Sequence, residues 1–265
     1  MEYLQYSKIN KNIIKKAPTN SVFIVTTYLI KPHSETLLKL CIKRIQLFHP
    51  ECDIIILNDS SSVIINIPIT KKLKIETTKY PRSGELNAYV WACEHSNDYK
   101  EFFFIHDSVL LINRFLVDLE GINYRGLWYS SKCINDDTCG YDVDTIVSKF
   151  TINNHNINNK INIIRQGQGS IVFGCMGVFN SKFLEFLKNN TNFLDLVSLF
   201  NTRKLRSFFE RLIYIILSEF YDVKYFDSYS LCGDINNHVD AFHTCSLLNM
   251  NFANNLYALK IWQGR

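Results

Sequence analysis

A polar interruption in an apolar stretch is the strongest chemical signal in this sequence. The segment 102–112 starts with four apolar residues, continues with His106, Asp107 and Ser108, and becomes apolar again at Val109. Burying such groups without partners costs about 1–3 kcal/mol each. Open α/β sheets bind ligands at the ends of their strands, so the interruption predicts a ligand site at a strand end. The alternative is a hydrogen-bonded turn capped by His106 and Asp107.

The preceding part of the chain predicts the elements that place this segment. Residues 21–29 are rich in β-branched side chains and predict a buried strand. Ser34 is a candidate N-cap for a helix to Phe48 with one apolar stripe, and the following proline stops it. Residues 52–57 predict a second strand. This β-α-β unit predicts parallel strands.

The alternation continues toward the interruption. Residues 63–69 and 74–78 predict weaker strands, and Ser83 is a candidate cap for a helix over 84–95. The strand 102–105 follows directly. Strands that alternate with helices predict an α/β fold, with a mostly parallel central sheet between helices.

The second half shows weaker patterns, with a turn-rich loop at 135–140 and an Asn-rich stretch at 153–162. The elements predicted there are a strand at 124–129, a glycine-bracketed segment plus strand at 166–179, a helix from Asn180 or Ser181 to 188, a helix at 206–221, and a strand at 223–226. No repeat or linker appears, so we expect one domain over residues 1–265.

Composition limits the classes of function. The 265 residues are 47% hydrophobic, which allows a sizeable core, and the net charge of +4 without a Lys/Arg stripe argues against nucleic acid. No apolar run reaches the roughly 18 residues of a membrane span, and no signal peptide is apparent. The eight cysteines form no CxxC pair, so we expect reduced thiols in the cytoplasm. A Cys133–Cys139 bridge is the alternative in an oxidising compartment.

The interruption and its surroundings resemble the GT-A glycosyltransferases, whose signature is Asp-x-Asp at a strand end followed by apolar residues. Aligned on those apolar residues, His106 and Ser108 replace the two acids, and Asp107 takes the variable position. The resemblance implies a Rossmann-like single-domain α/β/α sandwich. Its nucleotide-binding half would be residues 20–112, and 113–265 would form the acceptor half and closing tail. Similar enzymes occur in giant viruses, which would place it in the host cytoplasm, and in bacterial surface-glycan clusters.

The resemblance implies a nucleoside-diphosphate sugar, UDP- or GDP-linked, as donor. In the family the ends of the first strands hold the base and ribose, while a helix start and a basic tail meet the diphosphate. Each of these features has an alternative role without a ligand. Asp59 would form an Asx turn, Arg82 would belong to an ordinary helix start, and the basic tail would be a free surface segment. The implied donor-site residues are Thr26, Thr27, Tyr28, Asp59, Arg82, His106, Asp107, Ser108, Lys260 and Arg265.

A divalent cation, Mn²⁺ or Mg²⁺, bridges the diphosphate in most such enzymes. The candidate ligands here are His106, Asp107 and a late histidine, His243, with His238 as its competitor. Because the two acids of the motif are absent, the alternative is that basic residues neutralise the diphosphate and no metal is used.

The implied reaction moves a hexose to a hydroxyl of a glycan or glycoprotein. An inverting enzyme needs a carboxylate base, for which Glu210 and Asp234 are candidates, whereas a retaining enzyme does not. The segment 174–177 would border the sugar, or is a tightly packed strand with glycine bulges. One alternative function is a non-catalytic GT-A-like module that binds glycans or partners. A nucleotidyltransferase is disfavoured, since no Gly-rich basic loop follows the first strand. The oligomeric state is open.

Overall fold

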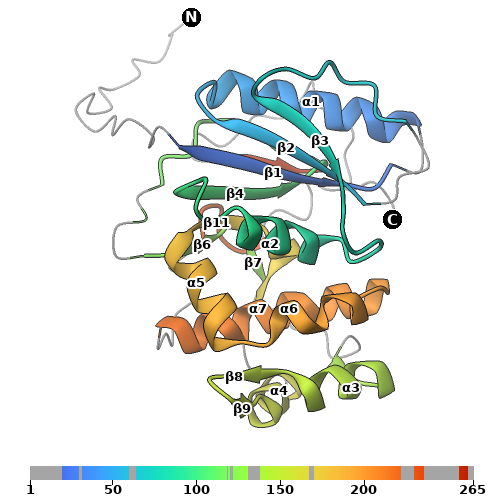
Figure 1. Ribbon diagram of the computed structural model, residues 1–265, viewed down its shortest axis with the longest axis vertical. Coiled ribbons are helices and arrows are strands. Elements are labelled where there is room, and N and C mark those ends of the chain that lie inside the picture. The colour runs from blue at the N-terminus through green and yellow to red at the C-terminus, as the bar shows by residue number, and fades with distance from the viewer. Residues whose placement is uncertain are drawn as a thin grey trace, which may run out of the picture.

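The computed structural model describes residues 20–29, 32–59, 64–117, 119, 122–130, 138–166, 170–221, 230–235 and 257–261. A six-stranded sheet runs through its centre in the order β3-β2-β1-β4-β11-β6 (Figure 1). Its strands are β1 (Ser21–Thr27), β2 (Asp53–Asn58), β3 (Leu73–Thr77), β4 (Glu101–His106), β6 (Tyr124–Gly126) and β11 (Gly177–Asn180).

The sheet is mostly parallel, as the sequence predicts. Strand β1 pairs in parallel with both β2 and β4, and β2 pairs in parallel with β3. Strand β11 is antiparallel to both of its neighbours, β4 and β6. The four parallel strands therefore have their carboxyl ends along one edge of the sheet.

Helices cover both faces of the sheet (Figure 1). On one side lies α1 (Pro32–Phe48), and on the other lie α2 (Glu85–Glu94), α5 (Ser181–Asn190) and α7 (Arg203–Tyr221). A further layer beyond α7 contains α3 (Tyr141–Lys149) and α4 (Asn158–Arg165), and the short α6 (Phe193–Leu196) precedes the 3-10 turn η3 (Val197–Leu199). The predicted α/β/α layering is confirmed.

Three small antiparallel pairs complete the described part of the fold. They are β5 (Val109–Leu111) with β12 (Ala258–Lys260), β7 (Tyr129–Ser130) with β10 (Ile171–Val172), and β8 (Thr151–Ile152) with β9 (His155–Asn156). The 3-10 turn η2 (Phe173–Cys175) joins β10 to β11. The first pair matters for function, because it brings the C-terminal part of the chain against the residues that follow β4.

Aromatic packing fixes β4 from both faces. On one face Phe103 stacks on Phe23 with ring centroids 4.6 Å apart, and on the other Phe102 stacks on Phe179 at 5.7 Å. Tyr89 of α2 stacks on Phe179 at 5.2 Å. Burial on both faces explains why β4 is a continuous apolar run, and it makes the end of β4 a rigid platform.

Several predicted elements differ from the structure. The predicted strand 63–69 is wrong over residues 64–69, which have no regular structure; Pro68 offers no N–H, and Ile64 is 88% exposed. The predicted strand 124–129 breaks at Leu127, which separates β6 from β7. Helices α3 and α4 were not predicted from the sequence, although their buried apolar residues lie at helical spacing: Val143, Ile146 and Val147 in α3, and Ile161 and Ile164 in α4. The predicted strand 223–226 lies outside the described residues.

Two predicted helix caps also differ. Helix α1 begins at Pro32, before the predicted cap Ser34. Gly84 occupies the N-cap position of α2, and the hydroxyl of Ser83 donates a hydrogen bond to the carbonyl of Val197 at 3.2 Å. The side chain of Asn180, by contrast, caps α5 by accepting from the backbone of Lys182 and Phe183, as predicted.

None of the helices in the described part of the chain has the length and apolar character needed to cross a membrane. The cysteines described as free thiols are Cys41, Cys52, Cys93, Cys139, Cys175 and Cys232. Cys133, the alternative partner of Cys139, lies outside the described residues.

Close packing of β11 against β6 yields a stability prediction. A Cβ atom at Gly177 would lie 2.5 Å from the backbone oxygen of Arg125. We expect Gly177→Ala to lower the free energy of unfolding by roughly 1–3 kcal/mol, as other overpacked cores do. Gly233→Ala is the control, because nothing lies within 4 Å of a Cβ there, and only its φ of +79° opposes the change. Chemical denaturation of both variants checks this, and an unchanged stability of Gly177→Ala would contradict the packing.

Candidate functional site

Predicted donor-site residues meet at the carboxyl edge of the sheet. Thr26 lies opposite Leu57 on one side and His106 on the other, and Thr27 lies opposite Asn58. Tyr28 follows β1 directly and is half-buried. The parallel register therefore brings residues from three separate parts of the sequence to adjacent strand ends.

Lys260 reaches this edge from the far end of the described chain. Its Nζ donates to Ser108 Oγ at 2.6 Å and lies 3.1 Å from His106 Nδ1. The backbone fixes this position, since Lys260 is paired with Val109 and the N–H of Ile261 donates to the Ser108 carbonyl at 2.8 Å. The structure thus joins one predicted clamp residue to two residues of the polar interruption.

Asp107 lies apart from these contacts. It accepts a hydrogen bond from the Thr27 hydroxyl at 2.7 Å, its own N–H donates to the Thr26 carbonyl, and it is only 1% exposed. Asp107 and Ser108 form the turn between β4 and β5, and the hydrogen bond to Thr27 ties the Asp107 carboxylate to the end of β1. Lys260 instead contacts His106 and Ser108, and the role of Asp107 in donor or metal binding stays a prediction.

His106 has a charged side chain near each of its ring nitrogens. A lysine ammonium has donors and no acceptor, so Nδ1 of His106 is the acceptor in the contact with Lys260. Nε2 of His106 lies 3.5 Å from Glu85 Oε1. A chain of polar groups consequently runs from Ser108 through Lys260 and His106 to Glu85.

Glu85 is a site residue that the sequence analysis missed. Its side chain is 21% exposed, and burial raises the pKa of its carboxyl, while Arg206 and Lys260 act in the opposite direction. The sequence did hold a signal, because Glu85 precedes Tyr89 by one helical turn and so lies on the buried stripe of α2. An acid on an apolar stripe usually has a partner or a function.

Arg206 is the second residue that was missed. Its stem lies against Gly84, where a Cβ atom would be 2.9 Å from Arg206 Cδ, and Gly84 has a φ of +48° that glycine favours. The guanidinium is 3.5 Å from the carbonyl of Arg82. The Arg82 side chain itself is exposed. Two cations, Lys260 and Arg206, therefore act on the carboxyl of Glu85.

Asp59 orders the turn that leads into α2. Its Oδ1 accepts from the Thr78 hydroxyl at 3.0 Å and from the Arg82 N–H at 2.8 Å, and its Oδ2 accepts from the Gly84 N–H at 3.0 Å. The residue is 2% exposed. Asp59 thus holds the backbone of the turn that leads to Glu85. A role of Asp59 in binding the base or ribose of a donor stays a prediction.

Glu210 lies beside the turn η2, whose Gly174 packs close to His106. Its Oε1 accepts from the N–H of Gly174 at 2.9 Å, and a Cβ atom at Gly174 would lie 2.9 Å from His106 Cε1. Burial raises the pKa of the Cys175 thiol, and the carboxylates of Glu210 and Glu85 add to the rise. Both carboxylates therefore flank η2. The other predicted base, Asp234, pairs through its backbone with Tyr129 and is largely buried.

The donor set at His106 does not fit the predicted metal ion. Lys260 places a positive charge against His106 and Ser108, and Asp107 faces Thr27. A divalent cation 4 Å from an ammonium would be repelled by roughly 8 kcal/mol even at an effective dielectric constant of 20. His243, the late metal candidate, and Arg265, the second clamp candidate, lie outside the described residues, as does His238.

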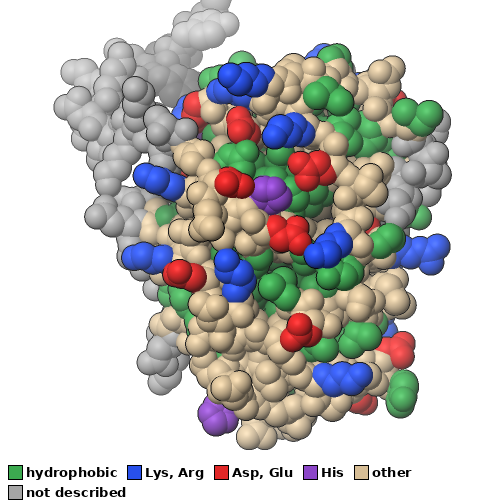
Figure 2. All heavy atoms as spheres, in the orientation of Figure 1, with side chains coloured by type: hydrophobic (Ala, Val, Ile, Leu, Met, Phe, Trp, Pro, Cys, Tyr) green, Lys and Arg blue, Asp and Glu red, His purple; other side chains and the backbone are tan. Residues whose placement is uncertain are grey.

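Charged side chains of both signs are interspersed on the face shown in Figure 2. A histidine lies among acidic and hydrophobic side chains near the middle of this face. The face carries no broad region of a single charge, which agrees with the absence of a Lys/Arg stripe from the sequence.

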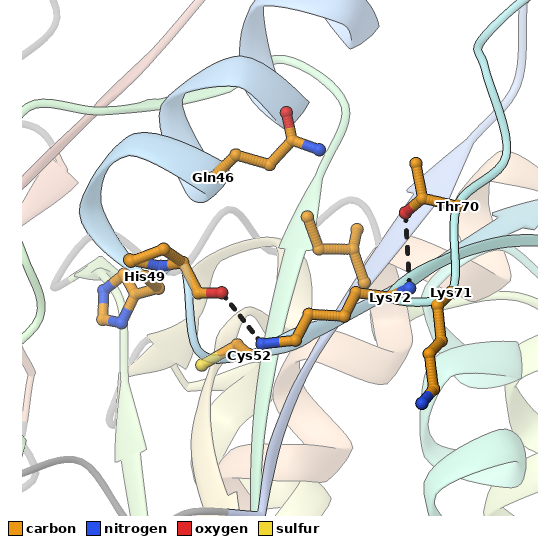
Figure 3. A pocket seen from close by; sticks show the side chains of 8 residues that line it. Gln46, His49, Cys52, Thr70, Lys71 and Lys72 are labelled. Carbon is orange, nitrogen blue, oxygen red and sulfur yellow. Dashed lines mark hydrogen bonds between the residues drawn. The ribbon is translucent and has the colours of Figure 1, made fainter.

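A cavity of about 330 Å³ lies at the opposite edge of the sheet, at the amino ends of β2 and β3 (Figure 3). Beside it, His49, Glu51 and Cys52 are spaced closely enough to hold a metal ion. His49 Nε2 accepts from the Phe115 N–H at 3.1 Å, so the proton of the neutral ring is on Nδ1, and Glu51 pairs with Arg114. Two of the three possible ligands, His49 and Glu51, therefore already bind other groups of the protein.

The sheet order, the helices on both faces and the polar strand ends agree with the Rossmann-like GT-A fold class predicted from the sequence. No protein-family model matches the sequence, and no curated protein matches it. Among solved structures, the chain is similar to the Mn/GDP form of core-mannan synthase A (CmsA/Ktr4) from Aspergillus fumigatus. The TM-score is 0.43 and the identity 12%, over 78% of this chain and 71% of that chain.

The contacts of Asp59 give a test of the turn before α2. Asp59→Asn keeps one acceptor oxygen but places an amide donor against a backbone N–H, so we expect a loss of roughly 1–3 kcal/mol in the free energy of unfolding. Thr78→Val, which removes a single bond to the same carboxylate, should cost less. Urea denaturation compares the two, and equal stability of Asp59→Asn and wild type would contradict this role.

His49 gives a prediction for pH. Burial lowers the pKa of His49 to about 4, helped by Arg114 and opposed by Glu51. Because the unfolded state takes up the proton first, stability falls as pH drops below the unfolded value near 6.5. Between pH 7 and 5 the wild type should lose roughly 2 kcal/mol more than His49→Gln, in which the amide oxygen can still accept from Phe115. The prediction is refuted if denaturation shows that wild type and His49→Gln lose the same stability between pH 7 and 5.

Proposed function

We propose that this chain is a glycosyltransferase that moves a hexose from a nucleoside-diphosphate sugar to a hydroxyl of a glycan or glycoprotein. The observation that supports the proposal best is the contact of Lys260 with both His106 and Ser108 at the carboxyl edge of the sheet. Such edges are where open α/β sheets bind nucleotides. A cation seated there suits an anionic leaving group.

Each part of the edge has a role in this proposal. In this proposal Thr26, Tyr28 and Asn58 bind the base and ribose of a UDP- or GDP-linked donor. Lys260 and Arg206 supply positive charge to the diphosphate as the sugar departs. Since the motif residues do not suit a divalent cation, none of these steps depends on Mn²⁺ or Mg²⁺.

The acceptor needs a base if the reaction inverts configuration. Glu210 is our candidate, because its carboxylate is held by the Gly174 N–H beside His106. Glu85 is the second carboxylate at the same turn. Asp234 lies beside β7 and is the weaker candidate of the two predicted from the sequence.

The reaction is tested by measuring the release of UDP or GDP from a panel of nucleotide hexoses, with and without glycan acceptors. We expect release from at least one donor, and a fall in kcat of about 100-fold or more in Glu210→Gln with little change in donor affinity. Glutamine can still accept from Gly174, so the variant removes basicity and leaves the contact. Glu185→Gln, at an exposed position on α5, is the matched control.

Two outcomes would contradict parts of this proposal. A full rate in Glu210→Gln excludes that residue as the base. Nucleotide binding without turnover of any donor would instead favour the non-catalytic GT-A-like binding module, for which the replaced acids of the motif are the motivating observation.

A further inference from the structure

Lys260 stands where a GT-A enzyme of the usual type needs a metal. In that family the two acids of the motif face a divalent cation, which in turn meets the diphosphate. Here the residues at the two positions, His106 and Ser108, both contact the ammonium of Lys260. The positive charge at this point is therefore supplied by the chain.

The neighbouring groups suit an ammonium better than a metal. The hydroxyl of Ser108 and the unprotonated Nδ1 of His106 are neutral acceptors, which match the donors of a lysine. Hard divalent cations prefer several carboxylate oxygens, and the carboxylate of Asp107 is turned toward Thr27. The two acids of Asp-x-Asp, which would hold a metal ion, are thus replaced by neutral residues that hold the ammonium of Lys260.

The site also holds a second cation. Arg206 lies against the start of α2, and both Arg206 and Lys260 act on the largely buried carboxyl of Glu85. The acids Glu85 and Asp59 lie at the same helix start, so Lys260 and Arg206 are the groups there that can pair with a phosphate. A diphosphate carries two or more negative charges and is bound well by such paired cations.

We infer that Lys260 replaces the divalent cation, so that nucleoside diphosphate binding by this chain depends on Lys260 and is independent of Mn²⁺ and Mg²⁺. This inference rests on the proposed function. The backbone pairing of β12 with β5 places Lys260 before any ligand arrives, because it is formed by main-chain bonds.

Isothermal titration of the full chain with UDP and GDP tests this in EDTA and in Mn²⁺. For the wild type we expect the same Kd within about twofold in both buffers. Lys260→Met keeps the stem and removes the charge, and it should weaken binding at least tenfold in both buffers, as loss of a charged hydrogen bond does. Lys260→Arg should retain more affinity than Lys260→Met. Lys43→Met, at an exposed position on α1, is the control.

The outcomes separate the two proposals. Binding that requires Mn²⁺, or an unchanged Kd in Lys260→Met, overturns the role of Lys260 and leaves the glycosyltransferase proposal standing. Absence of binding to UDP and GDP in both buffers overturns both. The comparison of buffers uses the wild type alone, so it decides the metal question even if Lys260→Met does not fold.

Discussion

The ammonium of Lys260, bonded to Ser108 and close to His106, is the interaction on which the site depends. It ties a strand from the C-terminal part of the chain to the end of β4, the central strand that aromatic packing holds from both faces. Because a lysine ammonium only donates, Ser108 Oγ and His106 Nδ1 are its acceptors. One side chain thus joins the C-terminal strand to both replaced positions of the motif.

Close packing by glycine makes this arrangement possible. Gly84 and Gly174 both have positive φ, and a Cβ atom on either would collide with a site side chain, Arg206 or His106. Asp59 holds the turn before Gly84, and Glu210 holds the N–H of Gly174. Asp59 and Glu210 therefore order the two turns whose glycines leave room for Arg206 and His106, which couples the stability of the turns to the geometry of the site.

The elements nearest the site were the most predictable from sequence. The strands β1, β2 and β4 and the helices between them are long, apolar and strongly periodic, so their order and parallel pairing followed from pattern alone. The strand prediction was wrong over residues 64–69 because an alternating apolar pattern does not show whether a neighbouring strand is available for pairing. Helices α3 and α4 were missed because each is short and carries only two or three apolar residues on its buried face, too few to stand out among the polar residues around them.

The contacts of the candidate site were only partly predictable from the sequence. His106 and Ser108 stood out because a polar break in a buried strand is costly, and Lys260 because the resemblance to GT-A enzymes implies a basic clamp late in the chain. The hydrogen bond of Asp107 to Thr27 could not be predicted, since it depends on the pairing of β1 with β4. Glu85 and Arg206 were missed because they act through a helix start and a helix face that are distant in sequence, and such pairings require coordinates.

The position of the diphosphate relative to Lys260 is the most direct measurement of how this site works. In a crystal structure of the complex with UDP or GDP, grown with Mn²⁺ present, we expect a phosphate oxygen about 2.7–2.9 Å from Lys260 Nζ, the distance of a charge-assisted hydrogen bond. A metal ion bound between His106 and Ser108 with Lys260 displaced, or a diphosphate bound elsewhere on the molecule, would contradict it.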